Sequence, residues 1–157
     1  SMNTIVRHIL KTRHCALLFS LALLASSATL RAQSLVVISN PQGNVSSISS
    51  AELKSLVKAE TQRWKDGSKV ILALMKSTTP VGLQTAQKVC GMDGDAFNKH
   101  WIAIVFQGKG TAPKYFTMED QLKAFVASTP GTIGIVGGDI ALDASVTHVT
   151  VDGKKSF

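Results

Sequence analysis

The chain has 157 residues and a formal net charge of +7, from 17 lysines and arginines against 10 acidic residues. Four basic residues and no acidic residue lie in residues 1–32, so the rest of the chain carries 13 basic against 10 acidic side chains, a net charge of +3. These remaining lysines are spread along the chain and form no cluster that would follow a phosphate backbone. The charge pattern therefore excludes a nucleic-acid-binding protein, and the length after residue 32 suits one domain with one core.

Residues 1–32 show the order of features that is typical of a secretory signal peptide. Arg7, Lys11 and Arg13 make the start of the chain positive, and residues 16–25 (ALLFSLALLA) form a short apolar segment ahead of several small residues. This segment is well below the roughly 20 apolar residues that a membrane-spanning helix needs. A signal peptide is therefore predicted, with a short buried helix as the alternative.

Processing of this segment defines the expected mature protein. Cleavage is expected after Ala32, because it leaves Gln33 directly ahead of a predicted strand, with Ala28 as a second candidate position. Ser1, which stands ahead of the initiator methionine, is interpreted as a cloning remnant. The processed chain, residues 33–157, is expected to be periplasmic or secreted.

The cysteines fit this interpretation. Cys15 lies in the predicted signal peptide, so Cys90 is the one cysteine left after cleavage, and an internal disulfide cannot form. Cys90 falls on the apolar face of a predicted helix. We therefore expect it to be buried, the alternative being that it links two chains as a dimer.

After residue 32, apolar strands alternate with amphipathic helices. Strands are predicted at residues 35–38, 70–75, 132–136 and 146–151. Helices are predicted from the capping box of Ser49 and Glu52 to about Ala59, from Pro80 to residue 90 with Thr79 as cap, after an Asp93 cap, and after a Thr117 cap. This alternation favours the α/β class, a single-domain three-layer sandwich with a mostly parallel or mixed sheet and helices on both faces.

Helical spacing also predicts which residues of the last two helices face inward. They are Phe97, Trp101, Ile104 and Val105 in one helix and Leu122, Phe125 and Val126 in the other. The aromatic residues could instead form a sugar-stacking surface, but the spacing of Trp101 favours the core. Tyr115 and Phe116, which follow a glycine-containing loop, are a candidate docking patch.

Residue patterns that support catalysis are scarce. His100 and His148 are the only histidines after residue 32, and they lie far apart with no ligand-type spacing. Asp93 and Asp95 lie close together, but Asp93 is better explained as a helix cap. The sequence holds neither a nucleophile-elbow motif nor a phosphate-binding P-loop. We therefore expect a protein that is not an enzyme and that uses neither a cofactor nor a metal.

The junction between the strand at 70–75 and the next helix does carry a pattern that suits ligand binding. In open α/β sheets, ligands collect beyond the carboxyl ends of strands. A helix N-terminus there offers free backbone N–H groups and a positive dipole end, to which Ser77, Thr78 and Thr79 add hydroxyl groups and Lys76 a charge. Residues 76–79 are therefore the candidate anion-binding site. The alternative is that Thr79 only caps the helix while the other groups face water.

The order of motifs after residue 34 resembles the periplasmic phosphate-binding, or type II substrate-binding, proteins of ABC transporters, as a small single-lobe relative. The matching segments are VVISNP (36–41), SSISSAEL (46–53), RWKDG (63–67), KSTT (76–79), FQGKG (106–110) and TPGTIGI (129–135). The resemblance covers residues 35–152 and implies the fold of one lobe of such a protein.

The same resemblance implies roles for the junction residues. In the family, an arginine and a Ser-Gly-Thr run at a helix N-terminus hold phosphate between two lobes. Ser77 and Thr79 match the serine and threonine, and Lys76 stands near the arginine. Thr78 stands where the family's Ser-Gly-Thr run has glycine. Lys76 also lacks the guanidinium group with which arginine binds an anion through two parallel hydrogen bonds. We also expect no second lobe, which would leave a bound anion open to water.

Two functions therefore remain open. The first is a periplasmic solute-binding-like protein that binds phosphate or a similar oxyanion for an ABC-type uptake system, completing its cleft as a homodimer or on a membrane transporter. The second is a non-catalytic protein-interaction module that keeps the binding-protein fold and has lost the ligand site.

Overall fold

The computed structural model describes residues 33–157. The predicted signal peptide, residues 1–32, lies outside the described residues. Within residues 33–157, no helix is long and apolar enough to cross a membrane.

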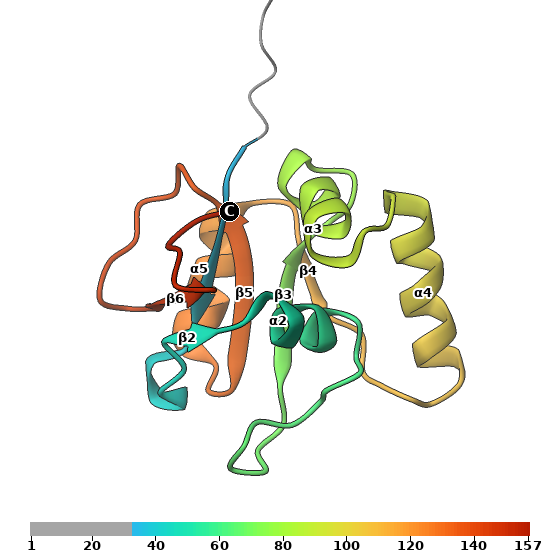
Figure 1. The fold of residues 1–157 in the computed structure, drawn as a ribbon, viewed down its shortest axis with the longest axis horizontal. Helices are drawn as coiled ribbons and strands as arrows, with labels where there is room; N and C mark the ends of the chain where they lie inside the picture. Colours follow the sequence, from blue (N-terminus) through green and yellow to red (C-terminus); the bar gives the residue numbers. More distant parts are fainter. Residues whose placement is uncertain (1–32) are drawn as a thin grey trace, which may run out of the picture. The chain divides into compact units, whose positions relative to one another are not determined.

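A six-stranded mixed sheet forms the centre of the domain (Figure 1). Its spatial order is β2-β6-β1-β5-β3-β4. β1 runs antiparallel to both of its neighbours, whereas β3 is parallel to β5 and β4. The strands are β1 (Leu35–Ser39), β2 (Ser47–Ile48), β3 (Ile71–Met75), β4 (Lys114–Phe116), β5 (Thr132–Gly137) and β6 (Thr147–Val151).

Helices cover both faces of this sheet, which confirms the predicted three-layer α/β architecture. α5 packs on one face, where Leu122 and Val126 lie so close to Gly134 of β5 that a side chain there would collide with them. α3 packs on the sheet together with α2, and α4 packs against α3. The helices are α2 (Ser50–Val57), α3 (Pro80–Cys90), α4 (Gly94–Phe106) and α5 (Glu119–Ser128), and a short 3₁₀ helix, η1, spans Pro41–Gly43.

Three of the predicted helix caps are confirmed. Ser49 and Glu52 form both hydrogen bonds of a capping box at α2. Thr79 caps α3 through the N–H of Gly82, and Asp93 caps α4 through the N–H of Ala96. These caps fix where the helices begin, and the α3 cap sets the geometry of the candidate anion site.

The predicted Thr117 cap is wrong. The N-cap of α5 is Met118, which makes no side-chain capping bond. The reason is tertiary: β4 pairs in parallel with β3, with Phe116 opposite Met75, and this pairing keeps the backbone extended up to the helix start. β4 and β2 were not predicted, because strands of two or three residues are too short to show a periodic pattern.

Most of the predicted inward residues are buried, but Val105 is not. Phe97 and Trp101 are buried and Ile104 is half-buried, whereas Val105 is 45% exposed. α4 packs on α3 rather than on the sheet, so only a narrow strip of its surface is covered. In α5, Leu122 and Val126 are buried, while Phe125 is half-buried against Phe116 at a ring-centroid distance of 5.5 Å.

Candidate functional site

The candidate anion site is the turn that joins β3 to α3. Its first residue, Lys76, donates its backbone N–H to the Phe116 carbonyl oxygen at 2.8 Å, which ties the end of β3 to β4. The Thr79 N–H then donates to the Lys76 carbonyl oxygen at 2.8 Å and closes the turn. The predicted junction is therefore a fixed turn that leads directly into the first turn of α3.

The hydroxyl group of Thr79 is engaged within this turn. Its Oγ1 accepts from the Gly82 N–H at 3.1 Å and donates to the Lys76 carbonyl oxygen at 2.7 Å. Thr79 is thus a cap as predicted, but in this structure its hydroxyl hydrogen points at the backbone. An anion could accept this hydrogen bond only if the hydroxyl turned away from Lys76.

Ser77 is engaged by a residue that the sequence did not single out. Its hydroxyl exchanges hydrogen bonds with the side-chain amide of Asn98 on α4, at 3.0 and 3.1 Å. Asn98 lies 21 residues further along the chain, and no local pattern connects it to the turn. It comes close because α4 packs on α3, so only the tertiary structure reveals this contact.

Lys76 and Thr78 complete the turn with exposed side chains. Within residues 33–157, the two ion pairs are Lys58–Glu60 and Lys123–Asp143, so no carboxylate pairs with Lys76. The Lys76 ammonium group is therefore available to an anion.

The start of α3 also presents backbone donors. Pro80 has no N–H, and the Gly82 N–H is used by Thr79, so the Val81 N–H is the group of the first helical turn that has no acceptor in the helix. Gly82 packs directly on the backbone of Met75 and Lys76, where any side chain would collide with the Lys76 carbonyl group. This close approach brings the positive end of the helix dipole to the end of β3.

The site is open rather than enclosed. Two cavities in the described domain, one lined by Leu56, Leu72 and Trp101 and one by residues 43–48 and 63–66, contain none of residues 76–79. An anion at this turn would therefore be bound on one side and hydrated on the other. In such a position, the charge interactions are weakened by water and salt.

The other candidate residues are engaged elsewhere. His100 Nε2 lies 2.9 Å from the Lys58 carbonyl oxygen, and His148 Nε2 lies 2.6 Å from the Lys155 carbonyl oxygen. Cys90 is buried as predicted, and burial raises the pKa of its thiol to about 11. A thiol of that pKa is almost fully protonated at neutral pH, which makes it a poor nucleophile. Among the described residues, no group of three His, Cys, Asp or Glu could hold a metal ion.

A scan against protein-family models and a search of curated proteins give no match. Solved structures do match. An ABC-type phosphate transport receptor from Vibrio cholerae superposes with a TM-score of 0.63 at 11% identity, over 80% of this chain and 49% of that chain. PstS from Borrelia burgdorferi superposes with a TM-score of 0.60 at 14% identity, over 78% of this chain and 48% of that chain. The third match is a putative phosphate ABC transporter substrate-binding protein from Clostridium perfringens, solved with bound phosphate. It superposes with a TM-score of 0.59 at 16% identity, over 78% of this chain and 46% of that chain.

This chain therefore spans about half the length of the structures that it matches. Identities this low establish the fold and nothing finer. Two of the three matches are named as a transport receptor and a substrate-binding protein rather than as enzymes. The six-stranded mixed sheet with helices on both faces is thus the fold of one lobe of a PstS-type phosphate-binding protein.

Proposed function

We propose that this domain is a solute-binding-like protein that binds phosphate or a similar oxyanion at residues 76–79. The observation that supports the proposal most is that Lys76, which pairs with no carboxylate within residues 33–157, lies in the turn at the N-terminus of α3, where the Val81 N–H has no acceptor in the helix. The similar structure from Clostridium perfringens was solved with bound phosphate. Residues 76–79 contain no acidic side chain, and the nearest acidic residues along α4 are Asp93 and Asp95, which flank Gly94 beside Ser77.

Binding would exchange hydrogen bonds rather than only add them. The Thr79 hydroxyl would give up the Lys76 carbonyl oxygen, and the Ser77 hydroxyl would give up Asn98. Hydrogen bonds to a charged oxyanion are stronger than the neutral bonds they replace, so the exchange is favourable but small. For one open lobe we expect a dissociation constant on the order of 1 mM.

A second surface would strengthen this binding by removing water from the anion. A second copy of the chain or a membrane transporter facing residues 76–79 would supply it, as expected for a component of an ABC-type uptake system in the periplasm. This arrangement requires export. We expect mass spectrometry of the protein recovered from the periplasm to give a chain that begins at Gln33, and recovery of the uncleaved chain from the cytoplasm would contradict it.

The direct test is calorimetric titration of residues 33–157 with phosphate at low ionic strength, with sulfate as the control anion. We expect saturable heat with phosphate that is lost when Ser77 and Thr79 are both replaced by alanine. Lys76→Met should weaken binding, whereas Lys99→Met, which removes an exposed charge on α4, should not. Unchanged binding in the double variant would remove the site from this turn.

A second function is supported by the outer surface of α4. Ile102, Val105 and Phe106 are 68%, 45% and 90% exposed, and their spacing places them on one side of the helix. Exposed apolar side chains gathered on one side of a helix are a feature of interaction surfaces. If phosphate does not bind, we therefore infer a non-catalytic interaction module that contacts its partner through α4.

A further inference from the structure

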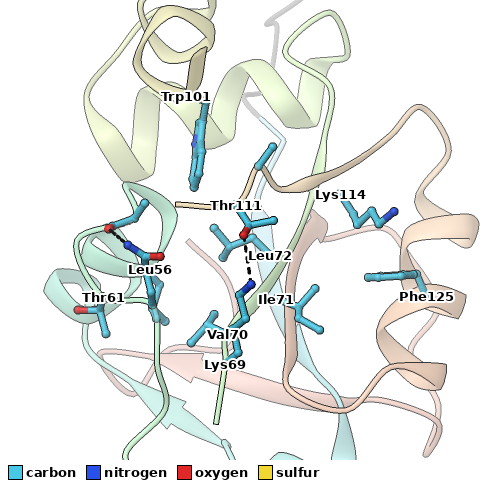
Figure 2. A pocket seen from close by; sticks show the side chains of 13 residues that line it. Leu56, Thr61, Lys69, Val70, Ile71, Leu72, Trp101, Thr111, Lys114 and Phe125 are labelled. Atoms are coloured by element: carbon cyan, nitrogen blue, oxygen red, sulfur yellow. Dashed lines mark hydrogen bonds between the residues drawn. The ribbon is translucent and has the colours of Figure 1, made fainter. Parts of the chain in front are cut away.

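A cavity of about 300 Å³ lies at the opposite end of β3 from residues 76–79. It is bounded by the end of α2, the start of β3, α4 and the loop that leads into β4 (Figure 2). The start of β3 and the anion-binding turn are separated by five residues of extended chain, about 16 Å. The cavity is therefore distinct from the proposed oxyanion site.

The inner wall of the cavity is apolar and holds an unsatisfied donor. Leu56, Leu72 and Trp101 form part of this wall, and Figure 2 shows the Trp101 indole extending from α4 toward Leu72 and Thr111. Trp101 is 4% exposed, and its Nε1–H has no acceptor among the described residues. By contrast, Trp64 Nε1 donates to the Gly131 carbonyl oxygen at 2.9 Å. The two indole N–H groups therefore lie in different environments, which makes them separate reporters of the cavity and of the rest of the domain.

The mouth of the cavity is basic. Lys69 Nζ donates to Thr111 Oγ1 at 3.1 Å across it, and Lys114 lines the side next to β4. Thr111 accepts this bond, and within residues 33–157 its own hydroxyl hydrogen has no acceptor. None of the 13 residues that line the cavity is acidic. An ammonium group and a hydroxyl thus lie at the mouth of one cavity whose lining contains no carboxylate.

The loop that closes the cavity is well fixed. Gln62 Nε2 donates to the Lys109 carbonyl oxygen at 2.5 Å, and Gly110 packs so closely on Ile104 that a side chain there would collide with it. The cavity is therefore bounded by packed elements rather than by a free loop. Its volume lies at the lower end of the range for ligand pockets, roughly 300–1,000 Å³.

We infer that this cavity binds a small apolar carboxylate anion, such as an aromatic acid. The hydrocarbon part lies against Leu56, Leu72 and Trp101, and the carboxylate accepts hydrogen bonds from Lys69 and Thr111 at the mouth. An apolar wall selects the hydrocarbon body. The basic mouth, free of acidic residues, selects the negative charge.

Benzoate is a suitable probe, and the two indole N–H resonances of residues 33–157 are the readout in a ¹⁵N–¹H spectrum. We expect the Trp101 resonance to shift saturably with benzoate, with a dissociation constant on the order of 1 mM, while the Trp64 resonance stays in place. Benzyl alcohol, which lacks the charge, should bind at least about tenfold more weakly. Equal binding of the two would overturn the assignment of the carboxylate.

Substitutions test whether benzoate binds beside Lys69 or responds only to the net charge of the protein. Lys69→Met should weaken benzoate binding at least about tenfold, whereas Lys99→Met, which removes the same charge elsewhere, should leave it unchanged. Ala112→Phe at the cavity rim should abolish the saturable shift while the rest of the spectrum keeps its dispersion. An unmoved Trp101 resonance at about 10 mM benzoate, or equal losses in the two lysine variants, would overturn the proposal.

Phosphate distinguishes this proposal from the preceding one. Because the two sites lie at opposite ends of β3, phosphate should leave the benzoate titration unchanged even if it binds at residues 76–79. Displacement of benzoate by phosphate would place both anions in one site and overturn the second site. Failure of phosphate to bind anywhere would leave the benzoate result standing on its own.

Discussion

Ser77 and Asn98, 21 residues apart in the chain, exchange hydrogen bonds of 3.0 and 3.1 Å between the β3–α3 turn and α4. This contact controls whether the Ser77 hydroxyl is free to bind an anion. Asn98→Ala would release the hydroxyl, and we expect phosphate binding to become as strong or stronger. Asn98→Asp would place a carboxylate beside the turn, and we expect binding to weaken at least about tenfold because like charges repel.

Calorimetric titration of both variants with phosphate checks this prediction. The pair is informative because the two substitutions remove the same amide and differ in charge. Equal affinities for the alanine and aspartate variants would show that the anion does not bind near Ser77.

Gly82 is required by the close packing of α3 on the end of β3. In an ordinary helix position, Gly→Ala is stabilising by up to about 1 kcal/mol. Here the added Cβ would collide with the Lys76 carbonyl group, which is backbone and cannot yield. We therefore expect Gly82→Ala to lower the free energy of unfolding by about 1–3 kcal/mol, measured by urea denaturation.

Gly94→Ala is the matched control, since Gly94 also lies in the first turn of a helix. Its added Cβ would meet nothing closer than 3.4 Å, an ordinary contact. We expect this variant to be neutral or slightly more stable than the original chain. A Gly82→Ala variant that is as stable as Gly94→Ala would mean that the collision at Lys76 is relieved by a small movement of α3.

Ionisation of the Cys90 thiol is expected to lower the free energy of unfolding at alkaline pH. Burial raises the pKa of its thiol from 9.0 to about 11, so the folded state holds the proton more tightly than the unfolded state. The stability from this difference is fully present below pH 9 and is lost as the pH rises through 11. Urea denaturation at pH 8 and pH 10 should show a larger decrease for the original chain than for Cys90→Ala.

The same burial predicts low reactivity of the thiol. At pH 8, a disulfide reagent should label Cys90 of residues 33–157 slowly in buffer and completely in denaturant. Rapid labelling of the folded protein would contradict the burial of Cys90 and would revive the possibility of a linked dimer.

The apolar surface of α4 predicts self-association. We expect residues 33–157 to show a concentration-dependent mass in light scattering, and the double substitution Ile102→Ser with Phe106→Ser to reduce it. Because both side chains are exposed, the free energy of unfolding should change by no more than about 0.5 kcal/mol. Met118→Ser, at another exposed apolar position, should leave the mass unchanged. A monomer at all concentrations would show that this surface does not join two copies.

Much of the architecture could be predicted from local patterns. The continuous apolar runs that became β1, β3 and β5 showed buried strands, and the caps at Ser49, Thr79 and Asp93 showed where three helices begin. These features rest on hydrogen bonds and periodicities within a few residues. The resemblance of the motif order to phosphate-binding proteins is matched by the solved structures, at the level of one lobe.

The features that the sequence did not predict depend on contacts between distant segments. β4 exists because residues 114–116 pair with β3, and that pairing moved the start of α5 beyond Thr117. Val105 is exposed because α4 packs on α3 and not on the sheet.

The sequence by itself thus determined the class of the fold, the order of its main elements and the turn at residues 76–79, because each is encoded by neighbouring residues. Only the tertiary structure decided that Asn98 forms hydrogen bonds with Ser77 and that Lys69, Thr111 and Trp101 line one cavity. These groups come from separate elements, and packing of those elements against one another, which no local pattern encodes, places them together.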